Sequence, residues 1–289
     1  MQKKPSIIEL EQHALQMRKD IISMIGIAAS GHPGSSLSIV EIVTVLFHVC
    51  MRHDPKRPEW SDRDRFVLSK GHAAPALYAA YAQSGYIPRE WLNTLRKFGS
   101  QLQGHPDKRK LSISEASTGS LGQGLSIAIG MGMAAKLDHK DYHTYCLIGD
   151  GESNEGQIWE AALFAAHHKI DNLTAILDYN KFQLDGPVKD ILNMEPMDKK
   201  WASFGWHVEE IDGHNLGEII QAFEKTKIIK GKPSIIIAHT IKGKGVSFME
   251  NNNHFHGVAP IPEEVKKALQ ELGETPDQIA QTLKLVNQS

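Results

Sequence analysis

The chain of 289 residues has little cysteine, no long uninterrupted apolar run and almost no excess of either charge. Its two cysteines, Cys50 and Cys146, lie in apolar sequence contexts, which excludes a disulfide scaffold and favours a reducing compartment. The longest mostly apolar stretch, Leu37 to Met51, contains Glu41 and His48 and is too short to cross a bilayer.

The charges nearly cancel, because Lys and Arg total 32 and Asp and Glu total 34, a formal net charge of −2. This balance predicts no nucleic acid and no membrane as partners. Residues 1–11 lack the apolar core of a secretory signal, and we expect none. The sequence is instead rich in histidine, with 15 residues, and contains 24 glycines, and their placement is informative.

Hydrophobic periodicity divides the chain into helices and strands. Short apolar runs alternate with helical patterns in the second half, which is typical of a mostly parallel sheet with helices on both faces, the α/β class. No repeat or linker divides the chain, so we expect one α/β domain over residues 1–289 with a C-terminal helical extension. The predicted strands are 65–69, 144–148, 173–177, 206–211 and 234–239, and the predicted helices are 7–29, 37–51, 73–84, 89–98, 125–137, 154–168, 216–226, 263–272 and 276–286.

A Gly-Asp-Gly triplet, residues 149–151, directly follows a predicted strand. Its glycines allow a ligand to approach the backbone, and Asp150 offers a hard oxygen to a divalent cation. Asn180 lies 30 residues later at the end of the next strand, so one crossover brings both side chains to neighbouring strand ends. Taken alone, the triplet would be a plain turn and Asn180 a strand-end cap. Together they predict a site where Mg²⁺ bridges the protein to a diphosphate.

The triplet and its spacing to Asn180 resemble the thiamine diphosphate-binding motif. The resemblance implies a thiamine diphosphate-binding fold in which Mg²⁺ (or Ca²⁺ or Mn²⁺) is held by Asp150, Asn180 and the backbone carbonyl of Phe182. Tyr179 stands where this family usually has asparagine or aspartate, a departure that leaves the ligand Asn180 in place.

Four predicted loops place a histidine beside glycine or proline. A histidine in such a loop can point into a cleft, donate to phosphate or hydroxyl oxygens and exchange protons near neutral pH. One alone would most simply face solvent or cap a helix, whereas four favour a shared site. Their spacing does not match a zinc site, and neither cysteine has a Cys-x₂-Cys partner. The loops are Ser30–Gly34, Lys70–His72, Gln103–Pro106 and Phe255–Gly257.

These loops, in their order and approximate spacing, resemble transketolase from about residue 20 to residue 265. The resemblance implies that His32 and His256 contact the donor sugar and the reacting centre, and that His105 holds a donor hydroxyl. It also implies that His72 and Gly151 contact the diphosphate, Gly151 through its N–H, with His256 close by.

Two further segments match the same family. The resemblance implies that Gly119, Ser120 and Leu121 lie against the cofactor, with their backbone near its aminopyrimidine ring. Glu155 and Glu160 match a carboxylate network at the family's dimer interface, and we count Glu155 among the catalytic candidates. The alternative is that both glutamates lie on a solvated helix face.

The segment Lys242–Gly245 matches a loop that closes over the cofactor in this family, and a solvated basic turn is the alternative. No arginine lies within the motifs, which agrees with recognition of the sugar phosphate by another domain.

Thiamine diphosphate chemistry, as the resemblance implies it, moves a two-carbon ketol unit from a ketose phosphate to an aldose phosphate. In this family a glutamate that contacts the aminopyrimidine lies in a second α/β domain, and the sequence contains no second such array. We therefore expect the N-terminal subunit of a split, cytoplasmic transketolase of the pentose phosphate pathway. It would be active only with a separate C-terminal, pyrimidine-binding subunit, in a heterotetramer of two plus two.

Other thiamine diphosphate enzymes are the nearest alternatives. A transketolase for an unusual sugar phosphate would share all of these residues. A 1-deoxyxylulose phosphate synthase, a dihydroxyacetone-forming enzyme or the α subunit of a 2-oxo acid dehydrogenase are other possibilities, although the α subunits lack the combined Ser-Gly-His-Pro-Gly and Gly-His-Pro loops. A non-catalytic cofactor-binding homologue is the alternative outside this class.

Overall fold

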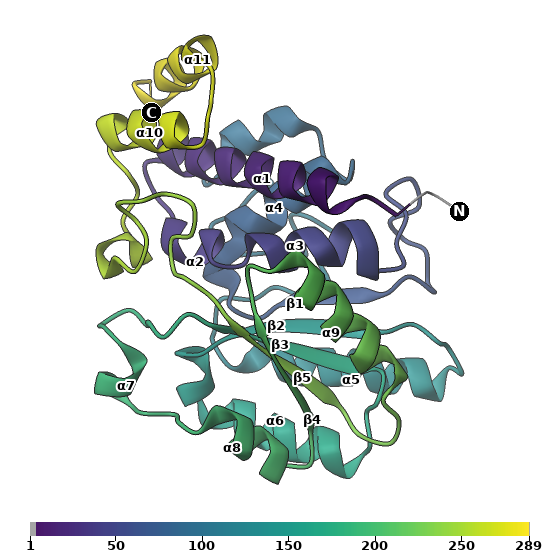
Figure 1. Ribbon diagram of the computed structural model, residues 1–289. Coiled ribbons are helices and arrows are strands. Elements are labelled where there is room, and N and C mark those ends of the chain that lie inside the picture. The colour runs from purple at the N-terminus through teal and green to yellow at the C-terminus, as the bar shows by residue number, and fades with distance from the viewer. Residues whose placement is uncertain (1–3, 289) are drawn as a thin grey trace.

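The computed structural model describes residues 4–288 and is built around one five-stranded sheet (Figure 1). All neighbouring strands in it run parallel, which confirms the predicted α/β sheet. Each predicted strand is present, with its ends moved by at most two residues. In spatial order the strands are β1 (Arg65–Leu68), β2 (Thr144–Gly149), β3 (Leu173–Tyr179), β5 (Ser234–His239) and β4 (His207–Asp212).

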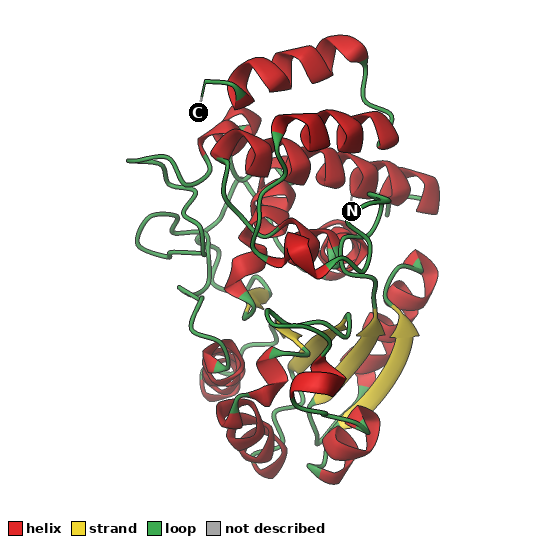
Figure 2. Cartoon of the chain, turned by 90° about the vertical axis from the view of Figure 1, so that its left-hand side faces the viewer, coloured by secondary structure: helices red, strands yellow, loops and turns green. Residues whose placement is uncertain are grey.

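Helices cover both faces of this sheet, as Figures 1 and 2 show from two directions. The helices on one face are α1 (Ile7–Ala28), α2 (Pro33–Leu37), α3 (Val40–Val45), α4 (Ala74–Gln83) and α9 (Leu216–Ile228), and those on the other are α5 (Gln123–Leu137), α6 (Gly156–His167) and α8 (Met197–Ser203). The last two helices, α10 (Pro262–Glu271) and α11 (Pro276–Val286), pack on the outside of α1, and the short α7 (Val188–Ile191) lies in the connection after β3.

Successive strand residues supply the two hydrophobic cores in turn. In β2, Tyr145 and Leu147 enter the core shared with α1 and α4, whereas Cys146 and Ile148 enter the core shared with α5 and α6. Both faces are therefore buried, which explains why the strands appear in the sequence as continuous apolar runs rather than as alternating patterns.

The predicted helix 37–51 is wrong as a single element. The chain forms α2, breaks, forms α3 and ends in a π-helical turn at Leu46–Cys50. The break lies at Ser38 and Ile39, where the Ser38 hydroxyl donates to the carboxylate of Asp178 at 2.7 Å. The apolar pattern indicated a buried segment, but it held no information on this long-range contact. The predicted helix 89–98 is likewise only a 3₁₀ turn, Arg89–Thr94, and α7 and α8 were not predicted.

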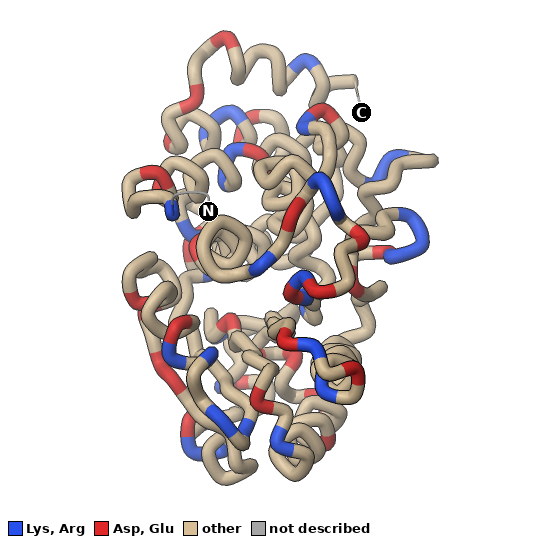
Figure 3. The backbone as a smooth tube through the Cα atoms, turned by 90° about the vertical axis from the view of Figure 1, so that its right-hand side faces the viewer, with Lys and Arg blue, Asp and Glu red and all other residues tan. Residues whose placement is uncertain are grey.

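In Figure 3, basic and acidic positions are interspersed along the backbone in helices and loops. Within residues 4–288, no helix combines the length and the apolar character needed to cross a membrane.

His143, next to the start of β2, is expected to make the fold less stable at acid pH. Its Nε2 lies 2.8 Å from the hydroxyl of Thr174, and burial, with smaller contributions from Lys227 and Lys230 and opposed by Asp171, lowers its pKa to about 3. Below pH ~6.5 the unfolded chain binds a proton at this position that the folded chain does not. The free energy of unfolding therefore decreases as the pH is lowered from about 6.5 to about 3.

We expect His143 to account for about 2 kcal/mol of the stability lost between pH 7 and pH 5. Urea denaturation of the wild type and of His143→Gln at both pH values measures this. The variant should lose less stability on acidification than the wild type. An equal loss in both proteins would show that His143 is not the group responsible.

Candidate active site

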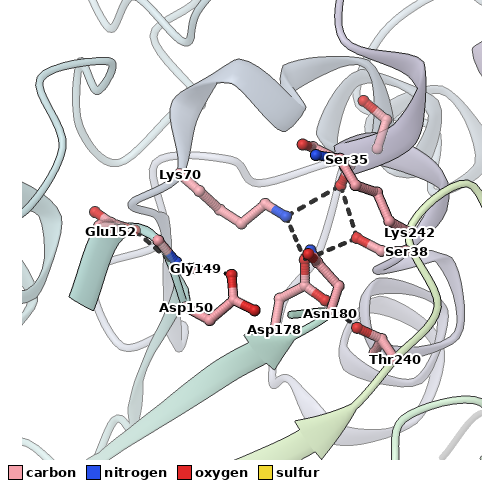
Figure 4. A network of polar contacts seen from close by, with 12 residues as sticks. Ser35, Ser38, Lys70, Gly149, Asp150, Glu152, Asp178, Asn180, Thr240 and Lys242 are labelled. Carbon is pink, nitrogen blue, oxygen red and sulfur yellow. Dashed lines mark hydrogen bonds and ion pairs between the residues drawn. The ribbon is translucent and has the colours of Figure 1, made fainter. Parts of the chain in front are cut away.

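The Gly-Asp-Gly triplet and Asn180 meet at one edge of the sheet. Gly149 pairs with Asp178 in the register of β2 and β3, so the residues that follow these strands lie side by side. Asp150 and Asn180 are both buried and both line one cleft. The predicted crossover geometry is thus present, and Figure 4 shows the two side chains near the ends of their strands.

Asp150 is a buried carboxylate without a cationic partner among the described ion pairs. Its oxygens accept from the backbone N–H groups of Gly151, at 2.7 Å, and of Lys181. Burial and, second, the negative charge of Asp178 raise the pKa of Asp150 to about 7. A divalent cation would supply the missing positive charge, so the donor set fits a hard metal ion.

Asn180 is oriented by its neighbours. Its Nδ2 donates to the Asp178 carboxylate at 2.8 Å, and its Oδ1 accepts from the N–H of Phe182 at 3.1 Å. Within residues 4–288 no group of three or more His, Cys, Asp or Glu side chains is placed to hold a metal. A metal at Asp150 would therefore need amide, carbonyl or ligand oxygens to complete its coordination.

Below the cleft lies a buried charged network that the sequence analysis missed (Figure 4). Asp178 is fully buried and forms an ion pair with the equally buried Lys70, which also donates to the carbonyl of Ser35 at 3.1 Å. Asp178 accepts from the hydroxyls of Ser38 and Thr240 as well. With the amide of Asn180, these donors hold the pKa of Asp178 below its usual value despite complete burial.

Glu152 joins the end of β2 to the glycine-rich loop before α5. Its carboxylate accepts from the N–H of Gly149 at 3.0 Å, from the N–H of Gly122 at 2.9 Å and from the Ser69 hydroxyl. Gly124 packs so closely on Ser69 that a β-carbon there would lie 2.7 Å from the Ser69 Cα, so the glycine is required by this contact.

The four loop histidines converge as predicted. The ring centroid of His32 lies 5.3 Å from that of His72, 6.2 Å from that of His105 and 5.9 Å from that of His256. Burial lowers the pKa of His32 to about 4 and that of His256 to about 3, and it also lowers the pKa of His72 and His105. All four rings are therefore neutral at pH 7 and can both donate and accept hydrogen bonds.

Arg96 reaches the same place, contrary to the expectation that no arginine accompanies the motifs. Its Nη2 lies 3.5 Å from His32 Nδ1 and 3.4 Å from the Gly104 carbonyl, and its Nη1 donates to the Ser30 hydroxyl at 3.0 Å. Its backbone is left-handed, with φ 59°, and its N–H donates to the Leu102 carbonyl. Arg96 lies in a segment that we predicted as helix, which is why its approach to His32 was not foreseen.

These groups surround a cavity of about 370 Å³, which we call the histidine cleft. Gly119 and Leu121 line it, but Ser120 between them is exposed and is not part of the lining. Glu155 is exposed at its rim, and Glu160 lies outside it, beside α5. The lining comprises His32, Ser35, Lys70, His72, His105, Gly119, Leu121, Gly149, Asp150, Gly151, Glu152, Asn154, Glu155, Asn180, Phe182, Gln183, Leu184, Asp185 and His256.

Residues 11–286 match the family model described as "Transketolase, thiamine diphosphate binding domain". The chain belongs to the transketolase family. It is 49% identical over 265 residues to the 6-deoxy-6-sulfo-D-fructose transketolase subunit SqwG of Clostridium sp. (strain MSTE9), covering 92% of this chain and 96% of the relative. It is 43% identical to an apulose-4-phosphate transketolase subunit of Phocaeicola vulgatus, covering 92% and 94%.

Single-chain transketolases match over only part of their length. The human transketolase is 41% identical over 268 residues, which cover 90% of this chain and 42% of the human one. The solved transketolase of Campylobacter jejuni superposes with a TM-score of 0.89 at 34% identity, covering 98% of this chain and 47% of that chain. The chain thus spans about half the length of the solved transketolases and corresponds to the N-terminal subunit of a transketolase-type enzyme. The predicted thiamine diphosphate-binding fold and family are confirmed.

Proposed function

We propose that the histidine cleft binds the diphosphate end of thiamine diphosphate through a divalent cation, Mg²⁺ in the first instance. Asp150, the Oδ1 of Asn180 and the backbone carbonyl of Phe182 would hold the cation. The observation that carries this proposal is the buried carboxylate of Asp150, which forms no ion pair within residues 4–288, beside a fixed asparagine amide at two neighbouring strand ends. His72, His256 and the N–H of Gly151 would bind the diphosphate, and Gly119 and Leu121, which line the cleft, would contact the ring.

The bound cofactor supplies a carbanion equivalent that breaks and forms the carbon–carbon bond. The chain's own part is to bind, orient and move protons. His32, His105 and His256 are neutral at pH 7, so each can donate a hydrogen bond to a substrate oxygen or accept a proton from a hydroxyl. Glu155 at the rim would belong to a carboxylate pair with the partner chain rather than contact the sugar.

His105→Ala separates binding from proton transfer. His105 is an exposed residue of the cleft lining and is not among the proposed ligands of the metal or the diphosphate, so we expect thiamine diphosphate affinity to stay within about twofold of the wild type and kcat to fall by roughly 10²–10⁴. The control is His254→Ala, because His254 is exposed and lies outside the cleft lining. This variant should keep the cofactor affinity and the kcat of the wild type. If His105→Ala also lost cofactor affinity, His105 would be a cofactor-binding residue rather than one that acts on the substrate.

The reaction that we propose is transfer of a two-carbon ketol unit from a ketose phosphate to an aldose phosphate. The names of the relatives at 49% and 43% identity favour a second candidate, a transketolase for an unusual donor such as 6-deoxy-6-sulfo-D-fructose or apulose 4-phosphate. A donor panel with xylulose 5-phosphate, fructose 6-phosphate and these two ketoses, assayed on the complete enzyme, distinguishes them. Absence of two-carbon transfer from every ketose would contradict both.

We further propose a separate C-terminal, pyrimidine-binding partner and a heterotetramer of two plus two. The support is that the chain matches transketolase subunits almost end to end and single-chain transketolases over less than half of their length. Both cysteines are buried and unpaired, which agrees with a cytoplasmic location. Co-expression with the candidate partner, followed by mass measurement of the complex, tests the stoichiometry.

A further inference from the structure

The segment 241–245, which follows β5, places the ammonium group of Lys242 behind His256, a residue that lines the histidine cleft. The side chain of Lys242 is fully buried, and its Nζ lies 2.6 Å from His256 Nδ1 and 2.8 Å from the Oδ1 of Asn253. Because the ammonium group can only donate, His256 must accept at Nδ1 and carry its proton on Nε2. The position of Lys242 thus determines which tautomer of His256 is present.

The path of the Lys242 side chain is narrow. A β-carbon at Gly34 would lie 3.1 Å from Lys242 Cγ, and the carbonyl of Gly34 accepts from the N–H of Gly243 at 3.0 Å. Gly243 itself has φ +80°, and a β-carbon there would lie 2.2 Å from the carbonyl oxygen of Met249. These contacts leave little space around the backbone on either side of Lys242, so its side chain is directed toward His256.

On its outer side the segment meets a second buried charged group, which we call the Arg18–Glu41–His214 network. Arg18 Nη2 donates to Glu41 Oε1 at 2.6 Å, and His214 Nδ1 lies 3.0 Å from Glu41 Oε2. The three residues come from α1, α3 and the turn between β4 and α9. Hydrogen bonds from His214 and Arg18 keep the pKa of Glu41 low although the carboxylate is buried.

The network holds the segment at both ends. The N–H of Ile241 donates to His214 Nε2 at 2.8 Å, and Arg18 Nε donates to the carbonyl of Lys244 at 2.9 Å. Gly245 has φ +94°, and a β-carbon there would lie 2.6 Å from Arg18 Nε, so this contact requires glycine. Lys242 therefore lies between two backbone hydrogen bonds, one to His214 and one to Arg18, and both of these side chains are held by Glu41. We call these two hydrogen bonds the anchors.

We propose that the Arg18–Glu41–His214 network is a positioning device that fixes segment 241–245 and so keeps Lys242 against His256 at the wall of the histidine cleft. Glu41 touches neither Lys242 nor the histidines of the cleft and acts through Arg18 and His214 alone. A hollow of about 980 Å³ on the outer surface is lined by all three network residues and by Lys244, so the anchors lie next to solvent rather than in the main core. The use of Lys242 in catalysis rests on the proposed function, but its anchoring does not.

Lysine acetylation of the full chain tests this proposal without any activity measurement. In the wild type, Lys242 and Lys70 are both buried beside the same cleft and both should react slowly, as measured by mass spectrometry of each lysine. In Glu41→Gln we expect the rate at Lys242 to rise about tenfold, the effect of losing about 1.4 kcal/mol of charge-assisted hydrogen bonding. Lys70, which Asp178 holds, should stay protected.

Glu115→Gln is the matched control, because Glu115 pairs with Arg63 with side-chain exposures of 8% and 13%, similar to those of Glu41 and Arg18 at 11% and 8%. It should not change the labelling of Lys242. If circular dichroism shows that Glu41→Gln does not fold, the acetylation of Lys242 is measured in His214→Gln instead, and the same increase in rate is expected. Unchanged protection of Lys242 in the folded network variant, or equal exposure in Glu115→Gln, would overturn the proposal.

Discussion

Replacement of Asp150 by alanine or asparagine is expected to abolish Mg²⁺-dependent binding of thiamine diphosphate. The carboxylate is buried, accepts only from two backbone N–H groups and has no cation within the described ion pairs, so it contributes the only full negative charge from the proposed metal ligands. Removal of a directly coordinating group should weaken affinity by about 100-fold or more. Calorimetric titration of the complex with the C-terminal partner, using thiamine diphosphate with and without Mg²⁺, measures this loss.

The same substitution should not weaken the fold, which separates binding from stability. Burial raises the pKa of Asp150 to about 7, so at neutral pH the charged form is unfavourable in the metal-free chain. We expect metal-free Asp150→Asn to unfold at a temperature no lower than the wild type. Asp185→Ala, at the exposed rim of the same cleft, is the control and should bind the cofactor normally. Wild-type affinity in Asp150→Asn would refute the metal site.

The motifs in the sequence were enough to predict where the cleft lies. A short strand followed by Gly-Asp-Gly, and an asparagine one crossover later, places two side chains at neighbouring strand ends whatever the packing elsewhere. The four loop histidines were predicted to share a site because each lies beside glycine or proline in a predicted loop and because these loops resemble transketolase. His32 and His256 meet there although 224 residues separate them.

The buried charges beneath the cleft were not predictable in the same way. Lys70 is the first residue of the Lys70–His72 loop and Asp178 lies two residues before Asn180, but nothing in the sequence pairs the two across 108 residues. Glu41 interrupts an apolar run and was a visible signal of a buried ion pair, but its partners Arg18 and His214 come from other elements. Periodicity shows that a position is buried, whereas the partner of a buried charge depends on tertiary packing.

Local structure was predicted less well where side chains override backbone preference. The hydroxyl of Ser38 bonds to Asp178 at the point where the expected helix 37–51 breaks. Arg96 has a left-handed backbone within a segment of helical pattern and thereby reaches His32. Both departures lie at the candidate site, in agreement with the tendency of functional sites to contain the locally unfavourable conformations of a fold.

Dependence on a partner chain is the second large effect that we expect. The chain aligns with less than half of the human transketolase, and its cleft contains Lys70, four histidines and the proposed metal ligands but no glutamate proposed to contact the aminopyrimidine. In α6, apolar side chains are exposed, with Leu163 62% and Phe164 44% exposed, which suits a contact with another chain. The isolated chain should therefore bind cofactor weakly and transfer no ketol unit.

A titration of ketol-transfer activity with the purified C-terminal partner tests this central claim most directly. The chain is kept at fixed concentration with saturating thiamine diphosphate and Mg²⁺, a ketose donor and an aldose acceptor. The rate of ketol transfer is then measured as the partner is added. We predict no activity without partner, a rise that saturates at one partner per chain, and no activity from the partner alone. Turnover by the isolated chain, at a rate that the partner does not increase, would contradict the account.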